Sequence, residues 1–256
     1  MENNNNFYVP AKAQQIFTTI TPEQLAQILP KSQLSNKGII TSLVVRPEPN
    51  TRKIVDTMHI LDDGIEADKK DSLISYTPVT LMRSDVSSAL GGAQIPGDNI
   101  HVAGLDIGQK SLNSGDLIVV TENDSILENS NITPKAILLK TDIPHHACWK
   151  IESRCGKTAL SFLNAESVYE NGHKTINGDI IHGLQDRLRG LKLFVLKAGI
   201  IKTGDVVTIV KDEEKVALLN SIPELKKQYG ECLENTRLIA GKIEQQELVK
   251  RNLRKK

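Results

Sequence analysis

One cysteine lies in a short stretch of residues whose side chains could together perform chemistry. Cys148 is preceded by His145 and His146 and is followed by Lys150 and Arg154. A thiol acts as a nucleophile or as a metal ligand in its thiolate form, and neighbouring cations or imidazolium groups favour that form. The stretch therefore predicts a reactive or metal-binding thiolate.

Three other interpretations of this cysteine follow from its residue type. With His145 or His146 as base, Cys148 could be the nucleophile of an acyl-transfer enzyme, although such partners usually lie far apart in sequence. With these histidines and Cys155 it could bind zinc, although the spacing matches no compact zinc motif. It could also pack beside the neighbouring tryptophan, as many free cysteines do. Cys155 and Cys232 are predicted to be packing residues.

Other cationic residues could bind an anionic group. Lys69 and Lys70 lie in a charged loop, and a lysine can meet a phosphate as a point charge. Arg189, directly before Gly190, is a further candidate for an anion clamp. The basic tail at 250–256 could touch an anionic partner, but a solvated chain end explains it more simply. None of these features is specific by itself.

The composition limits the class of protein. The chain has 256 residues, of which 39% are hydrophobic and 25% are charged, and its formal net charge is +1. These values are typical of a globular protein that buries a sizeable core. The charge balance excludes the global positive field of a nucleic-acid-binding protein. Three cysteines do not form a disulfide framework, and they suit a reducing compartment.

The N-terminal residues show no targeting signal. The asparagine run at 3–6 provides neither a basic nor an apolar segment, and the first arginine is Arg46. No apolar run approaches the roughly 18 residues that suggest a membrane span. We therefore expect a soluble, cytoplasmic protein without a membrane span.

The elements that must position the candidate residues are mostly short strands. Segments rich in Ile, Val and Thr, separated by Gly, Pro and Asn, are typical of strands. The sequence predicts strands at 39–46, 53–61, 73–76, 79–82, 99–102, 116–121, 135–141, 191–196 and 204–210. The first two are predicted to form a hairpin, and the last two a second pair after a turn through Gly199. Strands this short at close spacing favour a barrel or a sandwich.

Helices are predicted at both ends of this β region. Thr21 and Pro22 begin a predicted helix that ends near residue 30. Shorter helices are predicted at 84–90, 157–168 and 179–188. Beyond residue 211, apolar residues recur at helical spacing, which predicts two helices broken at Pro223 or Gly230. The chain therefore divides into a leader at 1–37, a β domain at 38–210 and a helical extension at 211–256.

Several short motifs stand in a characteristic order between about residues 38 and 210. They are Gly64-Ile65-Glu66-Ala67-Asp68, Gly97-Asp98-Asn99-Ile100, Gly104-Leu105, Gly115-Asp116, Ala136-Ile137-Leu138, Cys148-Trp149-Lys150-Ile151 with Arg154 and Gly156, Arg189-Gly190-Leu191, and Gly204-Asp205. Their order and spacing resemble those of the MOSC family, the domain found at the C-terminus of molybdenum-cofactor sulfurases and in stand-alone proteins.

The resemblance implies a mainly β fold, a barrel related to that of pyruvate kinase, with helical N- and C-terminal extensions. It also implies a pocket for the phosphorylated pterin of molybdenum cofactor, and binding of pyridoxal phosphate is a further property that it suggests. Cys148 matches the family cysteine and would bind molybdenum as a soft ligand to a redox metal. The residues expected to contact the cofactor are Lys69, Lys70, Asn99, His145, His146, Lys150, Arg154 and Arg189.

Family members include reductases of N-hydroxylated substrates, so the resemblance implies reduction of an N–O bond in a small molecule, with Cys148 as the catalytic residue. Electrons would come from partner proteins, because the chain has no G-x-G-x-x-G motif for a nicotinamide or flavin. Two alternatives stay open: sulfur transfer through a Cys148 persulfide, and a barrel that only binds a phosphorylated small molecule or a protein. The chain departs from the family pattern at residues 67–70, where Gly-Asp followed by an Arg or His pair is typical.

Overall fold

The description rests on a computed structural model, which describes residues 28–29, 31–48, 51–68, 79–108, 111–122, 133–141, 143, 145, 163, 167–170, 173–176, 188–236 and 238. The strands are β1 (Lys37–Val45), β2 (Lys53–Val55), β3 (Thr57–Leu61), β4 (Gly64–Ile65), β5 (Val79–Arg83), β6 (Ile100–Ala103), β7 (Leu117–Thr121), β8 (Ala136–Lys140), β9 (Ser167–Glu170), β10 (His173–Ile176), β11 (Leu191–Lys197), β12 (Gly199–Lys202) and β13 (Val206–Val210). The helical elements are η1 (Lys31–Gln33), α2 (Ser84–Ala89), α5 (Asp212–Ser221) and a stretch at 223–236.

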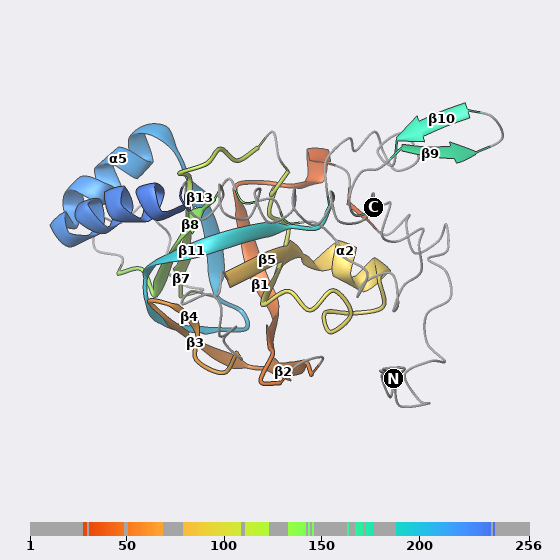
Figure 1. Cartoon of the computed structure of the whole chain (residues 1–256), viewed down its shortest axis with the longest axis horizontal. Helices are drawn as coiled ribbons and strands as arrows, with labels where there is room; N and C mark the ends of the chain where they lie inside the picture. The colour runs from red at the N-terminus through yellow and green to blue at the C-terminus, as the bar shows by residue number, and fades with distance from the viewer. Residues whose placement is uncertain are drawn as a thin grey trace, which may run out of the picture.

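Seven strands close into a barrel in the order β13-β7-β8-β11-β5-β6-β1, because β1 pairs with β13 as well as with β6. The barrel is mixed, since β5 and β6 are parallel and the other neighbours are antiparallel. Strand β2 pairs with β1, and β12, β3 and β4 form a separate sheet. In Figure 1, α5 and α2 lie on opposite sides of these strands. The predicted mainly β barrel is confirmed.

Barrel strands such as β7 and β8 are almost entirely apolar because both of their faces are buried. In β7, Ile118 and Val120 belong to the barrel core, whereas Leu117 and Val119 belong to a second cluster outside it. Successive side chains of a strand point to opposite faces, so the two clusters lie on opposite sides of β7. The outer cluster includes Leu225 of the C-terminal helices. The C-terminal extension therefore covers the outer face of this part of the barrel.

Most of the predicted elements are confirmed, with shifts of one or two residues at their ends. The predicted strands at 39–46, 79–82, 99–102, 116–121, 135–141, 191–196 and 204–210 correspond to β1, β5, β6, β7, β8, β11 and β13, and the helix at 84–90 corresponds to α2. The C-terminal helices break at Ile222 and Pro223, and the second helix continues through Gly230. The strand at 73–76, the helix at 179–188 and the basic tail lie outside the described residues, except for residue 188, which is not helical.

Two pairing predictions need correction. The predicted strand at 53–61 is divided at Asp56: β2 forms the expected hairpin with β1, but β3 pairs with β12 and β4. The predicted pair of 191–196 with 204–210 is wrong, because β11 pairs with β5 and β8 whereas β13 pairs with β1 and β7. Gly199 does not make the expected turn but begins β12, and a Cβ there would overlap the carbonyl oxygen of Lys135. The helix predicted at 157–168 is wrong at its C-terminal end, because residues 167 and 168 belong to β9.

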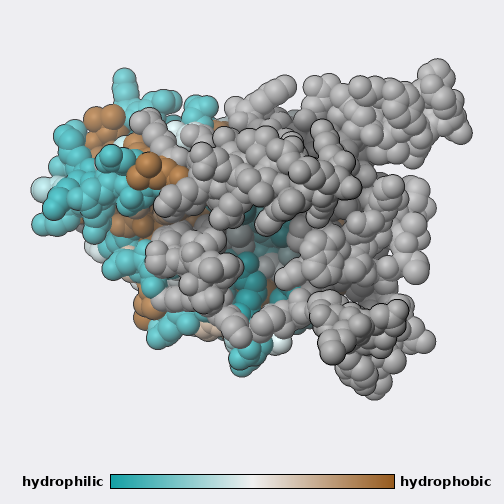
Figure 2. Space-filling model, viewed as in Figure 1, coloured by the Kyte–Doolittle hydropathy of each residue, from teal (hydrophilic) through white to brown (hydrophobic). Residues whose placement is uncertain are grey.

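The described surface is largely hydrophilic in the view of Figure 2, with apolar patches over the C-terminal helices. Val216 of α5 is among the exposed apolar side chains there, at 54% exposure. The described part of the leader is anchored to the barrel, because Ile28 is buried. Within the described ranges, no helix combines the length and the apolar character that crossing a membrane requires.

Candidate functional site

Asp98, two residues before β6, is the centre of a buried polar cluster. Its Oδ2 accepts a hydrogen bond from Nη1 of Arg189, which lies just before β11. Arg189 also donates from Nη2 to the carbonyl oxygen of Pro96, at 3.1 Å. Both charged side chains are buried. Their pairing offsets much of the cost of removing each charge from water.

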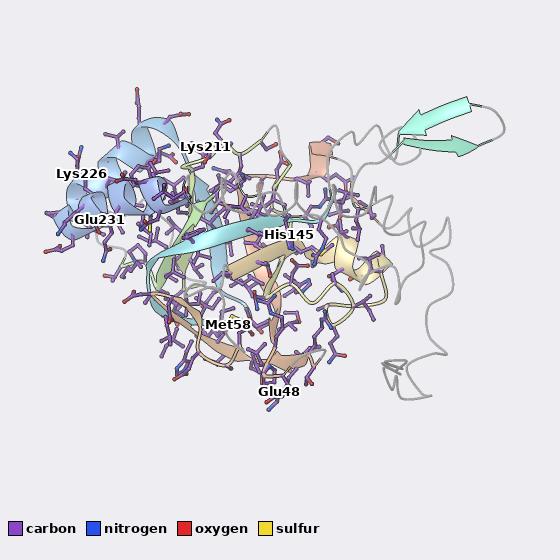
Figure 3. The ribbon with its side chains drawn as sticks, viewed as in Figure 1. Glu48, Met58, His145, Lys211, Lys226 and Glu231 are labelled. Atoms are coloured by element: carbon purple, nitrogen blue, oxygen red, sulfur yellow. The ribbon has the colours of Figure 1, made fainter. Side chains whose placement is uncertain are left out.

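Two histidines complete this cluster, which we call the Asp98 cluster (Asp98, His101, His145 and Arg189). Nδ1 of His145 lies 3.5 Å from Oδ1 of Asp98. Nε2 of His101 lies 2.9 Å from the carbonyl oxygen of Asp98. Because a carbonyl oxygen only accepts, His101 carries its proton on Nε2 and leaves Nδ1 as an acceptor. Figure 3 shows His145 beside β11 and β5.

The Asp98 cluster lies on the outer face of β5 and β6. Leu81 and Ile100 of these strands belong to the barrel core, and Met82 and His101, which follow them, point to the opposite face. Nη1 of Arg189 is 3.9 Å from the sulfur of Met82. The cluster therefore packs against the barrel from outside its core.

The environment of the cluster sets the charges of its members. Burial opposes ionisation of Asp98, but the guanidinium of Arg189 and the two histidines hold the pKa of its carboxyl below the ordinary value. Burial and the Arg189 charge lower the pKa of His145 to about 3. Burial also lowers the pKa of His101. Both histidines are neutral at pH 7, so His145 does not supply the positive charge to a thiolate that its residue type suggested.

Asn99 belongs to a second buried network. Its Oδ1 accepts hydrogen bonds from Nη2 of Arg46 at 2.8 Å and from the backbone N and Oγ1 of Thr80 at 3.0 and 2.8 Å. Its Nδ2 donates to the carbonyl oxygen of Val44 at 3.1 Å and to Oδ2 of Asp68 at 3.0 Å. The side chain is fully buried. Protein groups thus fill its hydrogen-bonding capacity.

Asp68 ties the end of the loop after β4 to the end of β1. Its Oδ1 accepts from the backbone N of Arg46 at 2.5 Å, and its Oδ2 accepts from Nε of Arg46 at 2.8 Å. Nη2 of Arg46 lies 2.6 Å from the same Oδ2. The contact is therefore charge-assisted and multiple, the strongest kind of carboxylate contact. It fixes the chain directly before Lys69 and Lys70.

The structure describes three of the predicted site residues and brings two of them together, whereas the side chain of Asn99 belongs to the separate network with Asp68. His145 and Arg189 both contact Asp98, and Asn99 is the next residue along the chain. The other predicted site residues lie outside the described residues: Lys69, Lys70, His146, Cys148, Lys150 and Arg154.

Sequence reasoning did not assign site roles to Asp98, His101, Asp68 or Arg46. A usable signal for Asp98 is its position between Gly97 and a strand that reads as buried. Gly97 has a φ of +68°, and a Cβ there would overlap the side chain of Arg52. Such a tight turn, followed by an acidic residue and then by a buried strand, indicates a carboxylate held inside the fold.

Some polar atoms of the Asp98 cluster have no hydrogen-bond partner among the described residues. These are Nε of Arg189 and Nδ1 of His101, and the contact of His145 Nδ1 with Asp98 Oδ1 is too long to be a good hydrogen bond. Buried polar atoms are normally satisfied. An acceptor for Nε of Arg189 and a donor for Nδ1 of His101 would satisfy these two atoms.

The described residues contain no group of three or more His, Cys, Asp and Glu side chains placed to hold a metal ion. Cys232 is the cysteine that they include. It is half-buried in the outer apolar cluster, its Sγ lies 3.8 Å from the carbonyl oxygen of Val195, and burial raises the pKa of its thiol. This environment confirms the prediction that Cys232 is a packing residue.

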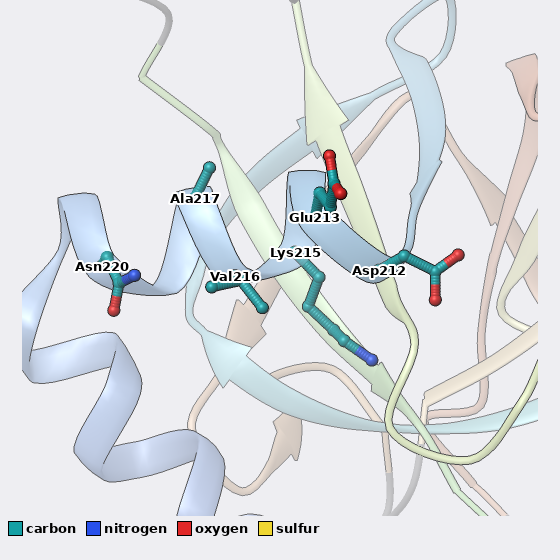
Figure 4. Close-up of a pocket in the computed structure, with 6 residues that line it drawn as sticks. All are labelled: Asp212, Glu213, Lys215, Val216, Ala217 and Asn220. Atoms are coloured by element: carbon teal, nitrogen blue, oxygen red, sulfur yellow. The ribbon is translucent and has the colours of Figure 1, made fainter.

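A hollow on α5 is separate from the Asp98 cluster (Figure 4). It is lined by Asp212, Glu213, Lys215, Val216, Ala217 and Asn220. Most of these side chains are exposed. The acidic residues lie in the first turn of the helix, where they stabilise its dipole. The position of these acidic residues at the start of the helix accounts for their charge, so the hollow gives no indication of a bound ligand.

No family model matches the sequence, and no curated protein matches it. Among solved structures, the chain is similar to the YuaD protein from Bacillus subtilis, with 16% identity and a TM-score of 0.42, over 68% of this chain and 95% of that chain. It is also similar to YiiM from Geobacillus stearothermophilus, with 15% identity and a TM-score of 0.40, over 68% of this chain and 75% of that chain. Likenesses of this size carry no information about the site.

Proposed function

We propose that this chain is a stand-alone MOSC-type barrel that binds a molybdenum-pterin cofactor and reduces N-hydroxylated compounds. In this proposal the Cys148 thiolate is the protein's ligand to molybdenum, because a soft thiolate suits a redox metal. The order of the sequence motifs and the closed, mixed barrel support the family assignment.

The observation that carries the proposal is the way in which two consecutive residues join three predicted cofactor-binding segments. Asp98 contacts Arg189 and His145. Asn99 contacts Asp68, the residue before the two predicted phosphate-binding lysines. Residues expected to share one ligand are thus anchored at one short segment before β6.

Covalent geometry limits how far Cys148 can lie from this cluster. Three peptide units separate its Cα from that of His145, so the two Cα atoms are at most about 11 Å apart. His145 is held beside Asp98, which binds Arg189. A ligand of moderate size could therefore contact both Arg189 and the thiol.

The described residues fit the neutral ring of such a cofactor better than its phosphate. The Nε–H of Arg189 is a buried donor and Nδ1 of His101 is a buried acceptor, both without partners among the described side chains, and a pterin ring carries polar groups of both complementary kinds. The positive charge of Arg189 is already compensated by Asp98. The phosphate would need the remaining predicted cations: Lys69, Lys70, Lys150 and Arg154.

When bound, the cofactor supplies a redox metal that can exchange two electrons with a substrate. Reduction of an N-hydroxylated compound consumes two electrons and two protons, breaks the N–O bond and releases the reduced nitrogen compound and water. A partner redox protein would provide the electrons. In this proposal the protein's own task is to bind and orient: Cys148 holds the metal, Arg189 and His101 hold the ring, and Asp98 positions Arg189.

A barrel that binds a ligand without catalysis is the second candidate. The charge pairing favours it, because the guanidiniums of Arg189 and Arg46 are each compensated by an aspartate, Asp98 and Asp68. Neither arginine therefore offers a full free charge to a phosphate. Asn99 has no free hydrogen-bonding atom for a ligand either, since protein groups occupy all of them.

The molybdenum content of the full-length protein, purified from a host that makes the cofactor, tests the proposal. We expect near-stoichiometric molybdenum in the wild type and in the control Cys232→Ser, and its loss in Cys148→Ser. Wild-type protein without molybdenum would contradict the proposal that the chain is a molybdenum-dependent reductase. If Cys148 then takes up sulfane sulfur from a desulfurase, the protein is a sulfur carrier instead. If it does not, the binding-only barrel remains.

A further inference from the structure

The segment before β1 is attached to the barrel through its main chain. The backbone N–H of Leu29 donates to Oδ2 of Asp85 at 2.7 Å, and the carbonyl oxygen of Leu29 accepts from Nη2 of Arg83 at 2.7 Å. The preceding side chain, Ile28, is 1% exposed. One residue of the leader is thus held at both of its main-chain polar atoms, and its neighbour is an apolar anchor.

Arg83 and Asp85 form a binding pair that does not depend on Leu29. Arg83 ends β5, and Asp85 lies in the first turn of α2. Nε of Arg83 donates to Oδ1 of Asp85 at 3.0 Å, and Nη2 contacts Oδ2. Each charge therefore keeps its partner when the leader is absent. The pair is preformed, with one donor and one acceptor directed at the same peptide residue.

A second attachment lies after β6. The backbone N–H of Ser35 donates to the carbonyl oxygen of Gly104 at 2.8 Å, and the N–H of Asp106 donates to the carbonyl oxygen of Ser35 at 2.7 Å. Because β5 and β6 are parallel, Arg83 and Gly104 lie at the same end of the barrel. Residue 29 and residue 35 are therefore both attached at this end of the strand pair. The first attachment is one residue from Met82, which contacts Arg189.

We propose that the described residues 28–29 and 31–35 belong to a strap that closes this end of the barrel, and that the Arg83–Asp85 pair is its receptor. The receptor recognises the main-chain N–H and C=O of one residue, so that backbone hydrogen bonds provide affinity and the buried position of Ile28 provides specificity. The side chain at position 29 is therefore free to vary, whereas position 28 must be apolar. This proposal goes beyond the proposed function and does not depend on a cofactor.

Hydrogen exchange on the unmodified full-length protein is the first test. We expect the Leu29 amide to exchange about 100-fold more slowly than the same amide in a free peptide of residues 24–33, because the half-buried carboxylate of Asp85 accepts its hydrogen bond. An amide that exchanges at the peptide's rate would overturn the proposal. This test does not depend on whether any variant folds.

Proteolysis of matched variants is the second test. Leu29→Pro removes the N–H that Asp85 binds, whereas Leu29→Ala keeps it. We expect tryptic cleavage at Lys31 to be about tenfold faster in Leu29→Pro and in Ile28→Asp, and to change less than about twofold in Leu29→Ala. Equal cleavage rates in the proline and alanine variants would show that the main-chain contact does not hold the strap.

Discussion

The carboxylate of Asp98 and the guanidinium of Arg189 form a buried ion pair, although 91 residues separate them in the sequence. The pair joins two residues that each lie two positions before a strand, Asp98 before β6 and Arg189 before β11. His145 approaches the second oxygen of the same carboxylate. One aspartate therefore fixes two of the side chains that the sequence predicts for a cofactor.

Replacing one partner of this ion pair should destabilise the fold more than replacing both partners with apolar residues. Asp98→Leu leaves the buried charge of Arg189 without its counter-charge, and we expect a loss of about 3–5 kcal/mol in the free energy of unfolding. The double variant Asp98→Leu with Arg189→Met should be more stable than the sum of the two single effects predicts, by about 1 kcal/mol or more. Urea denaturation of the four proteins measures this coupling. Additive losses would mean that the pair contributes no interaction.

Asn99 should be important for stability whether or not a cofactor binds. Asn99→Ala removes the partner of Arg46, Thr80 and Asp68 in a fully buried position. We expect a loss of about 2–4 kcal/mol, from several unsatisfied groups. The matched control is Asn36→Ala, whose side chain is exposed and which should change stability by less than about 0.5 kcal/mol. Similar effects of the two substitutions in denaturant unfolding would contradict the network.

Stability should fall as the pH is lowered from 7.5 to 5. In the unfolded chain a histidine takes up a proton near pH 6.5, but folded His145 stays neutral because burial and Arg189 lower its pKa to about 3. The unfolded state therefore binds more protons in this window, which destabilises the fold by up to about 1.4 kcal/mol per pH unit for this residue. The lowered pKa of His101 acts in the same direction.

The pH dependence can be assigned by one variant. His145→Gln should be less stable at pH 7.5, but its stability should decrease with falling pH less steeply than that of the wild type, by about 1 kcal/mol per unit below pH 6. Denaturant unfolding at several pH values gives the two slopes. Parallel curves for the two proteins would show that His145 is not held neutral in the folded state.

Two glycines should respond to alanine in opposite directions. Gly190 follows Arg189, has a φ of +86°, and leaves no room for a Cβ beside the carbonyl oxygen of Leu81. Gly190→Ala should therefore destabilise the protein by more than about 2 kcal/mol. Gly230 lies in the C-terminal helix with open space around it, so Gly230→Ala should stabilise by about 0.5–1 kcal/mol. Thermal unfolding of both variants checks the signs, and a neutral Gly190→Ala would contradict the tight approach.

Local patterns were sufficient to predict the barrel strands but not their pairing. Strands such as β7 read as strands because every residue is apolar or β-branched and both faces are buried. The parallel contact of β5 with β6 and the closure of β1 on β13 depend on packing between distant segments. Proximity in sequence suggested that β11 pairs with β13. Strand β12 lies between them in the chain, and each of the two pairs with other strands instead.

The arginine and the histidine of the candidate site were predictable from the sequence, and the aspartate that holds them was not. Arg189 and His145 attract attention by residue type, because they can bind or activate groups directly. Asp98 reads as an ordinary turn residue after a glycine, and its role appears only when the fold brings the segment before β6 to the segment before β11. The neutral state of His145 also depends on that placement, because burial sets it.

The central claim is that Cys148 binds the molybdenum of a pterin cofactor, and Mo K-edge X-ray absorption of the loaded full-length protein tests it most directly. We expect the wild type and Cys232→Ser to show one sulfur ligand to molybdenum more than Cys148→Ser shows when it is loaded under the same conditions. An unchanged molybdenum spectrum in Cys148→Ser, or a wild-type protein that binds no molybdenum, would contradict the claim.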